Sequence, residues 1–144
     1  MRHAAELVGL VTAGLFTGGP LFGALVEHPA RVEAGVPAAL AVLGPSMRRG
    51  VVLELAGAAI AFVACATAAA MGGRALWLVA GLLIGVVVPI TFIAVLPINR
   101  RLARARDVEP REAERLLHRF GRLHEGRAAL GLAGFVLAAV AALA

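Results

Sequence analysis

A histidine and an arginine one helical turn apart, His124 and Arg127, are the residues of this sequence best suited to carry out chemistry. The segment around them has helical periodicity, and both fall on the apolar stripe that also carries Phe120. An imidazole in such a place can remove a proton from a bound molecule, and a guanidinium beside it can hold the resulting anion. The plainer alternative is that Arg127 extends to lipid headgroups while His124 makes an ordinary hydrogen bond.

Further polar residues lie at the ends of apolar stretches, where they can reach the same depth as His124. Glu27 and His28 follow the first stretch, Glu54 lies one turn inside the second, and Asn99 follows the third. A carboxylate within a membrane is usually paired or functional, so we expect Glu54 to pair with Arg127. The sequence therefore predicts a polar layer at one end of a helical assembly.

Three kinds of chemistry fit this layer. A histidine or glutamate could act as a general base, with Arg127 and Asn99 stabilising an anion. A haem could lie between His28 and His124. A metal ion could be held by carboxylates and imidazoles, for which the candidates are Glu27, His28, Glu54 and His124. Ligand spacing supports neither metal nor haem, since Glu27 and His28 are adjacent and face different ways. The layer could also simply seal the bundle end with hydrogen bonds.

Four long apolar stretches must position these residues. Of the 144 residues 60% are hydrophobic and 16% are charged, whereas soluble domains are about half apolar and about a quarter charged. A bilayer core needs about 20 apolar residues as helix, which predicts membrane helices over about 4–26, 51–71, 75–97 and 128–144. An amphipathic helix over about 108–127, capped by Asp107, should continue into the last of them. We expect an all-α integral membrane four-helix bundle, in one domain over 1–144, with a cytoplasmic extension of its last helix.

Arginine alone supplies the positive charge that sets the expected orientation. Twelve of the 14 arginines lie between the first and second or the third and fourth stretches, and only Arg2 and Arg74 lie elsewhere. Basic loops stay in the cytoplasm, so we expect a multi-pass protein of the cell membrane with both termini outside. Residues 36–45 are interpreted as a re-entrant or interfacial piece. The charge predicts contact with the lipid bilayer and not with nucleic acid, because no aromatic-rich basic platform accompanies it. A homo-oligomer is compatible with the glycine-rich helices.

Two short motifs carry a resemblance to a known family. The pattern P-x-N-x-x-L is present at Pro97, Asn99 and Leu102, and a helix of the form W-x-x-x-H-x-x-R follows at His124 and Arg127. These runs resemble the anthrone oxygenase family, small four-helix membrane proteins of which many are catalogued only as a domain of unknown function. Phe120 stands where a tryptophan is usual in that family. The run Glu27-His28-Pro29-Ala30-Arg31 at the end of the first helix is also similar.

The resemblance implies an enzyme that oxidises an anthrone methylene to an anthraquinone carbonyl with O₂ and without a cofactor. It implies His124 as the base, Arg127 as the group that holds a phenolate or nascent superoxide, and Asn99 as the group that orients a hydroxyl or peroxide. Glu27, Glu54 and Phe120 would complete the site around a hydrophobic aromatic molecule. Two other functions remain open at this point: a non-enzymatic membrane subunit or scaffold, and a metal- or haem-binding redox protein.

Overall fold

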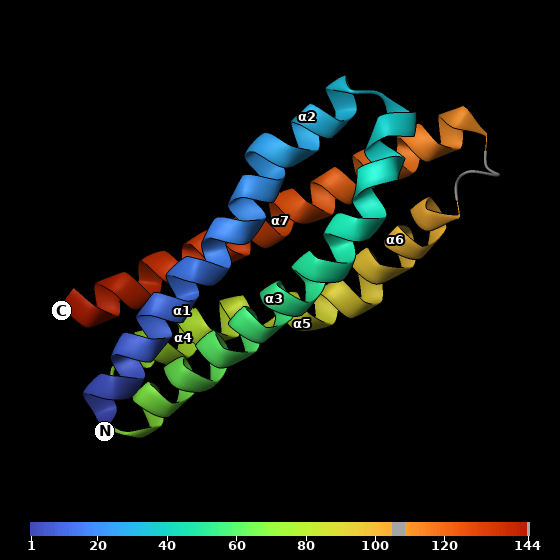
Figure 1. Ribbon diagram of the computed structural model, residues 1–144. Helices are drawn as coiled ribbons and strands as arrows, with labels where there is room; N and C mark the ends of the chain where they lie inside the picture. Colours follow the sequence, from blue (N-terminus) through green and yellow to red (C-terminus); the bar gives the residue numbers. More distant parts are fainter. Residues whose placement is uncertain (105–108, 144) are drawn as a thin grey trace.

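Four long helical stretches make up the chain in the computed structural model, which describes residues 1–104 and 109–143 (Figure 1). The first consists of α1 (Arg2–Phe22), the π-helical turn η1 (Gly23–Glu27) and α2 (His28–Glu33), and the second is α3 (Val36–Ala70). The third consists of α4 (Ala75–Gly85), α5 (Val87–Ile90), the π-helical turn η2 (Thr91–Val95) and α6 (Leu96–Ala103), and the fourth is α7 (Pro110–Leu143). All four are long and apolar enough to cross a membrane, with 32, 35, 29 and 34 residues. The predicted all-α membrane fold is confirmed.

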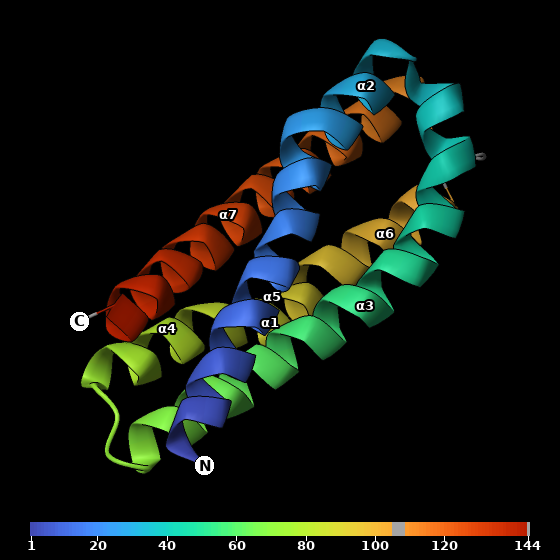
Figure 2. The same ribbon diagram turned by 60° about the vertical axis from the view of Figure 1, so that its left-hand side comes forward.

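The helices pack as a ring in which α1 and α4 each contact both α3 and α7. The start of α1, the α3–α4 turn and the end of α7 lie at one end, and the α2–α3 turn, the end of α6 and the start of α7 lie at the other (Figures 1 and 2). Buried alanines and glycines line the contacts, as membrane helices require for close approach. The hydroxyl of Thr17 joins α1 to α7 by donating to the Gly131 carbonyl at 2.9 Å.

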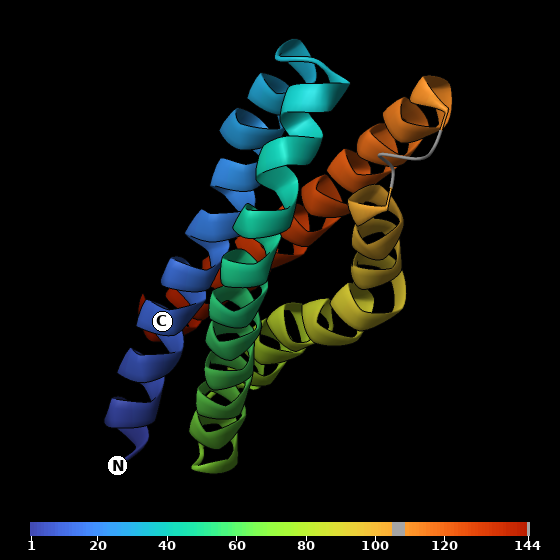
Figure 3. The same ribbon diagram turned by 45° about the vertical axis from the view of Figure 1, so that its right-hand side comes forward.

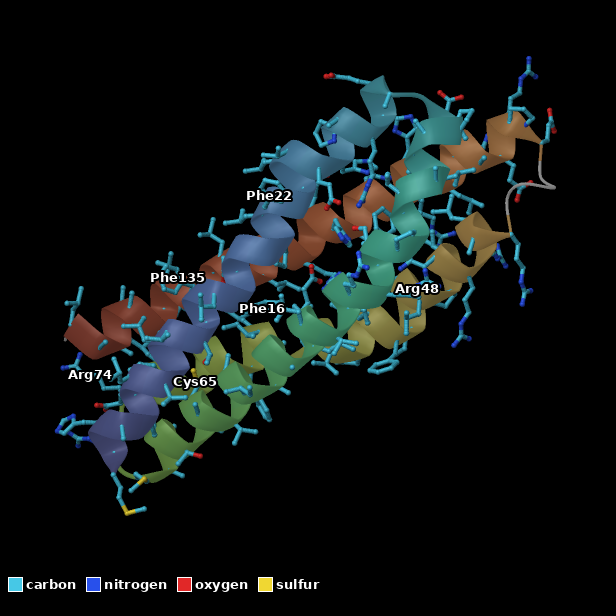
Figure 4. All side chains as sticks on the ribbon, in the orientation of Figure 1. Phe16, Phe22, Arg48, Cys65, Arg74 and Phe135 are labelled. Carbon is cyan, nitrogen blue, oxygen red and sulfur yellow. The ribbon has the colours of Figure 1, made fainter. Side chains whose placement is uncertain are left out.

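Large apolar side chains face outward on each long stretch. Leu15 is 75% exposed, Leu53 77%, Ile93 78% and Val136 48%. Such a surface is unfavourable in water and favourable against lipid chains, so it agrees with a membrane setting. The arginines are divided between the two ends of the molecule as expected. Arg74 lies at the end that holds the start of α1, and Arg48 lies toward the opposite end (Figure 4).

The interpretation of residues 36–45 as a separate re-entrant piece is wrong, because these residues form the first turns of α3. The prolines there favoured a boundary, yet Pro37 lies in the first turn, where proline is tolerated, and α3 continues through Pro45. The preceding turn depends on Gly35, whose φ of 83° suits only glycine well. Asp107, the predicted cap of the last helix, lies outside the described residues.

The third stretch bends between α4 and α6, which Figure 3 shows in profile. Pro89 in α5 and the π-helical turn η2 lie at the bend, and both are recognised causes of helix kinks. The bend brings α6 beside α3 and α7, and it therefore carries Asn99 toward the end of the molecule where the arginines gather.

Candidate functional site

His124 and Arg127 are buried in α7, with 4% and 1% of their surfaces exposed. The predicted apolar stripe of this helix is also correct, since Ala113, Leu116 and Phe120 are buried beside them. Two polar side chains thus face the packed interior of the protein near the arginine-rich end. Headgroup contact does not explain the position of Arg127, because only 1% of its side chain is exposed.

Arg127 forms the predicted ion pair with Glu54, which joins α7 to α3. Its Nη2 donates to Glu54 Oε2, whereas its Nε is buried and has no hydrogen-bond partner among residues 1–104 and 109–143. A buried arginine is stable only when its charge is compensated, and Glu54 supplies that compensation. The free Nε–H leaves this arginine one donor that a bound anion or carbonyl can use.

His124 lies against Gly23 of the first helical stretch, where a larger residue would have little room. A methyl group built on Gly23 would stand 3.3 Å from the His124 Cδ2 atom. On its other side the His124 ring contacts Phe120, with the ring centroids 4.4 Å apart. The Nδ1 atom is buried, and no partner for it exists in the described part of the chain.

The π-helical turn η1 begins at Gly23 and ends at Glu27. A π-helical turn shifts the register of the residues after it, and such turns occur often at functional sites. Here both His28 and Arg31, which follow the turn, are buried. The local geometry of the first stretch therefore directs two polar residues toward α7 and α3 in addition to the glycine that receives His124.

Glu27 belongs to a separate network and does not join the His124 and Arg127 pair. Arg31 donates from Nη2 to Glu27 Oε1 and, at 2.8 Å, to Ser46 Oγ. Ser46 Oγ donates to Glu27 Oε1 at 3.1 Å and so links the first stretch to α3. The spacing of Glu27 and Arg31, four residues apart in a helix, signals their pairing. Ser46 was missed because residues 36–45 were not recognised as part of α3.

His28 lies against Gly121 of α7, and its ring centroid is 6.1 Å from that of Phe120. A methyl group built on Gly121 would overlap the His28 ring. Phe120 is thus in contact with His124 and near His28, and the three rings form one aromatic cluster between the first stretch and α7. The sequence placed Phe120 on the apolar stripe, but the contact of its ring with two histidines was not predicted.

Replacing Gly121 by alanine should lower the free energy of unfolding by about 1–3 kcal/mol, because the added methyl displaces the His28 ring from a packed position. Gly126 provides a matched control on the same helix, since a methyl there meets nothing within 4 Å. Gly126→Ala should instead raise stability by about 0.5–1 kcal/mol. Thermal unfolding in detergent compares the two. Equal stability of both variants would mean that His28 is not seated against α7.

Asn99 of α6 forms no hydrogen bond with His124 or Arg127 in the described residues. Both polar atoms of its amide are buried and lack partners among residues 1–104 and 109–143. Asn99 lines two cavities of about 380 and 340 Å³ that lie between α3 and α6. Met47 and Gly44 of α3 line both cavities, and neither cavity is lined by His124 or Arg127. None of the cavities described between these helices is lined by Asn99 together with His124 or Arg127.

The candidate metal ligands do not converge in the described ranges of the chain. Within 1–104 and 109–143, no three His, Cys, Asp or Glu side chains are close enough together to hold a metal ion. Glu27 and Glu54 are paired with arginines instead. The Nδ1 atoms of His28 and His124 are fully buried and have no hydrogen-bond partner among the described residues.

A comparison with known proteins identifies the family. The anthrone oxygenase family model matches residues 43–137, about two thirds of the chain. The matched range includes Glu54, Asn99, Phe120, His124 and Arg127. No curated protein and no solved structure matches the sequence. On this match, and with four membrane-length helices in agreement with it, the chain belongs to the anthrone oxygenase family.

Proposed function

We propose that this protein is a membrane oxygenase that converts the methylene group of an anthrone-like polycyclic aromatic into a carbonyl with O₂. The observation that carries the proposal is the buried imidazole of His124, which has an unpartnered Nδ1 and lies one helical turn from the equally buried Arg127. Buried polar atoms are normally hydrogen-bonded, and exceptions are frequent where a protein binds a ligand or performs chemistry. Membership of the anthrone oxygenase family supports the choice of reaction.

His124 acts as the general base in this proposal. The methylene of an anthrone is acidic because the carbanion left behind is delocalised into the ring carbonyl as a phenolate. The neutral Nδ1 of His124 accepts the proton, and the Nε–H of Arg127 donates a hydrogen bond to the phenolate oxygen. A dry environment strengthens both interactions, which is an advantage of placing them inside a membrane protein.

The carbanion then reacts with O₂ to form a peroxide, which breaks down to the carbonyl and water. It gives one electron to O₂, and the resulting superoxide and carbon radical combine to form a C–O bond. The peroxide so formed takes a proton, and the amide of Asn99 is the group proposed to orient it. Loss of the second methylene proton and cleavage of the O–O bond yield the carbonyl and water. One O₂ is consumed, one of its atoms remains in the product, and the other leaves as water.

Access to the buried groups requires some movement of the helices at this end. His124 faces η1 and Asn99 follows η2 by four residues, so each lies beside a π-helical turn. Such turns have weaker hydrogen-bond ladders and lie where helices flex. The two cavities next to Asn99 lie within the size range of about 300–1,000 Å³ that is usual for small-molecule sites. They are large enough to admit a three-ring aromatic once the helices part.

The proposal is tested by the purified protein in lipid nanodiscs supplied with anthrone and O₂. Quinone formation should exceed that in empty nanodiscs, with one O₂ consumed for each product. A preparation that contains no metal or haem by elemental analysis and absorbance should keep this activity. Activity that follows the content of a bound metal would favour a redox protein instead. No activity, together with a stable complex with another membrane protein, would favour a subunit or scaffold.

We also propose that the arginine-rich end faces the cytoplasm of the cell membrane and that both termini lie outside. Support comes from the division of the arginines between the two ends. A cysteine introduced at Glu109 should be protected from a membrane-impermeant thiol reagent in intact cells, and one introduced at Met71 should be labelled. Cys65→Ala serves as the background, because Cys65 is buried. The reverse labelling pattern would contradict this orientation.

A further inference from the structure

A groove of about 360 Å³ runs between α1 and α3 on the outside of the protein. Its walls are largely apolar and include Leu15 and Phe16 of α1 and Leu53 and Ile60 of α3. Leu15 and Leu53 are more exposed than most residues of the chain, so the groove opens toward lipid. Phe16 lies where α1 and α3 run side by side (Figure 4).

Among the residues that the structure describes, Glu54 is the one ionisable residue that lines this groove. Its Oε2 is bound by Arg127, and its Oε1 lies on the side of Gly19, 3.7 Å from where a methyl on that glycine would be. Within residues 1–104 and 109–143, no side chain donates a hydrogen bond to Oε1. Thr12, the other polar residue of the groove, already donates to the Val8 carbonyl at 2.6 Å. A carboxylate oxygen is thus left without a donor on a wall that faces lipid, where polar groups are costly.

From this arrangement we propose that the groove binds a phenolic polycyclic aromatic from the bilayer, whose hydroxyl donates a hydrogen bond to Glu54 Oε1. The inference rests on the proposed function, because it supplies the recognition element for that class of substrate. Gly19 and Gly57 have no side chains, which leaves room along both walls of the groove for a flat molecule. The volume of the groove is within the usual range for small-molecule sites.

The choice of a phenol over a lipid chain follows from the chemistry of the groove. A lipid acyl chain fills apolar space but has no donor for the carboxylate. A phenolic hydroxyl supplies that donor, and hydrogen bonds to charged groups are stronger than those between neutral groups. Because Glu54 is paired with Arg127, a ligand held there lies beside the helix that carries His124. The groove would therefore admit the substrate from the lipid phase and hold its hydroxyl end.

The test measures binding of 2-hydroxyanthracene, which has no methylene to oxidise and, unlike the 9-isomer, is not a tautomer of anthrone. The comparison ligand is its methyl ether, 2-methoxyanthracene. The fluorescence of each ligand is titrated with protein in nanodiscs, and the signal from empty nanodiscs is subtracted. Hydroxyanthracene should bind about tenfold or more tightly than the ether, as expected for a hydrogen bond to a charged group. Ala56→Trp should weaken its binding by about tenfold or more because the indole fills the groove. Ala59→Trp is the matched control, since Ala59 is also exposed on α3 but does not line the groove.

Equal binding of the two ligands, or equal effects of the two tryptophan variants, would overturn the proposal and leave a groove that holds only lipid. These outcomes are separate from the fate of the proposed oxidation. If the Ala56→Trp variant binds hydroxyanthracene and oxidises anthrone like the wild type, the proposed binding in the groove is wrong, and the proposed oxygenase activity is unaffected. If the wild type binds hydroxyanthracene in the groove but does not oxidise anthrone, the proposed binding site is supported and the proposed oxygenase activity is wrong.

Discussion

Replacing His124 by alanine should reduce anthrone oxidation by about 10²- to 10⁴-fold, the usual contribution of a general base. The physical reason is that no other neutral base lies on the buried face of α7 beside Arg127, while Glu54 is already bound to that arginine. The rate of quinone formation in nanodiscs measures the effect, after subtraction of the spontaneous oxidation in empty nanodiscs.

His118 provides the control for this variant. It lies on the same helix but is exposed, and it is not part of the aromatic cluster of His28, Phe120 and His124. His118→Ala should therefore keep the wild-type rate. His124→Gln, which preserves most of the side-chain volume against Gly23, separates the loss of the base from a packing defect. Wild-type turnover in a folded His124→Ala protein would remove His124 from the mechanism.

Breaking the ion pair between Glu54 and Arg127 should destabilise the protein by about 3–5 kcal/mol, because either single replacement leaves an uncompensated charge away from water, in the packed interior or on the lipid-facing groove. Glu54→Leu leaves the guanidinium of Arg127 without an ion-pair partner, and Arg127→Leu leaves the carboxylate of Glu54 without one. The double variant with leucine at both positions should recover most of the stability, since no charge is then buried. Equilibrium unfolding in detergent gives the three free energies, and a double-mutant cycle gives the coupling.

The same variants separate stability from chemistry. The double variant should be stable but inactive, because it lacks the donor proposed to hold the phenolate. The ion pair of Arg2 with Glu6 is the comparison, since it is solvent-accessible and should contribute only about 0–1 kcal/mol. If Arg127→Leu is no less stable than Glu6→Gln, the Arg127 charge is not buried as the structure shows.

The residues on α7 and their ion pair were predictable because they depend on local periodicity and on the cost of burying charge. Helical spacing alone put His124 and Arg127 on the apolar stripe. The need to neutralise an intramembrane charge identified Glu54 as the partner of Arg127. These rules need no knowledge of how the helices are arranged, and the structure agrees with them.

The position of Asn99 and the environment of Glu27 were not predictable in the same way. Equal depth along the helices predicted a single polar layer, but depth does not determine the direction in which a side chain faces. The bend at η2 places Asn99 beside α3, and Arg31 with Ser46 holds Glu27 away from His124. π-Helical turns have no simple sequence signature, so a register shift at Gly23–Glu27 could not be expected. The contact of His28 with Gly121 is likewise visible only once the helices are packed.

The measurement that tests the central proposal most directly is the oxidation of anthrone under ¹⁸O₂ by the purified protein in nanodiscs. The proposed chemistry predicts a rate above that of empty nanodiscs, with one ¹⁸O atom in the new carbonyl of the quinone and the other in water. A rate no greater than that of empty nanodiscs, or a quinone formed by the protein whose new oxygen comes from water, would contradict it.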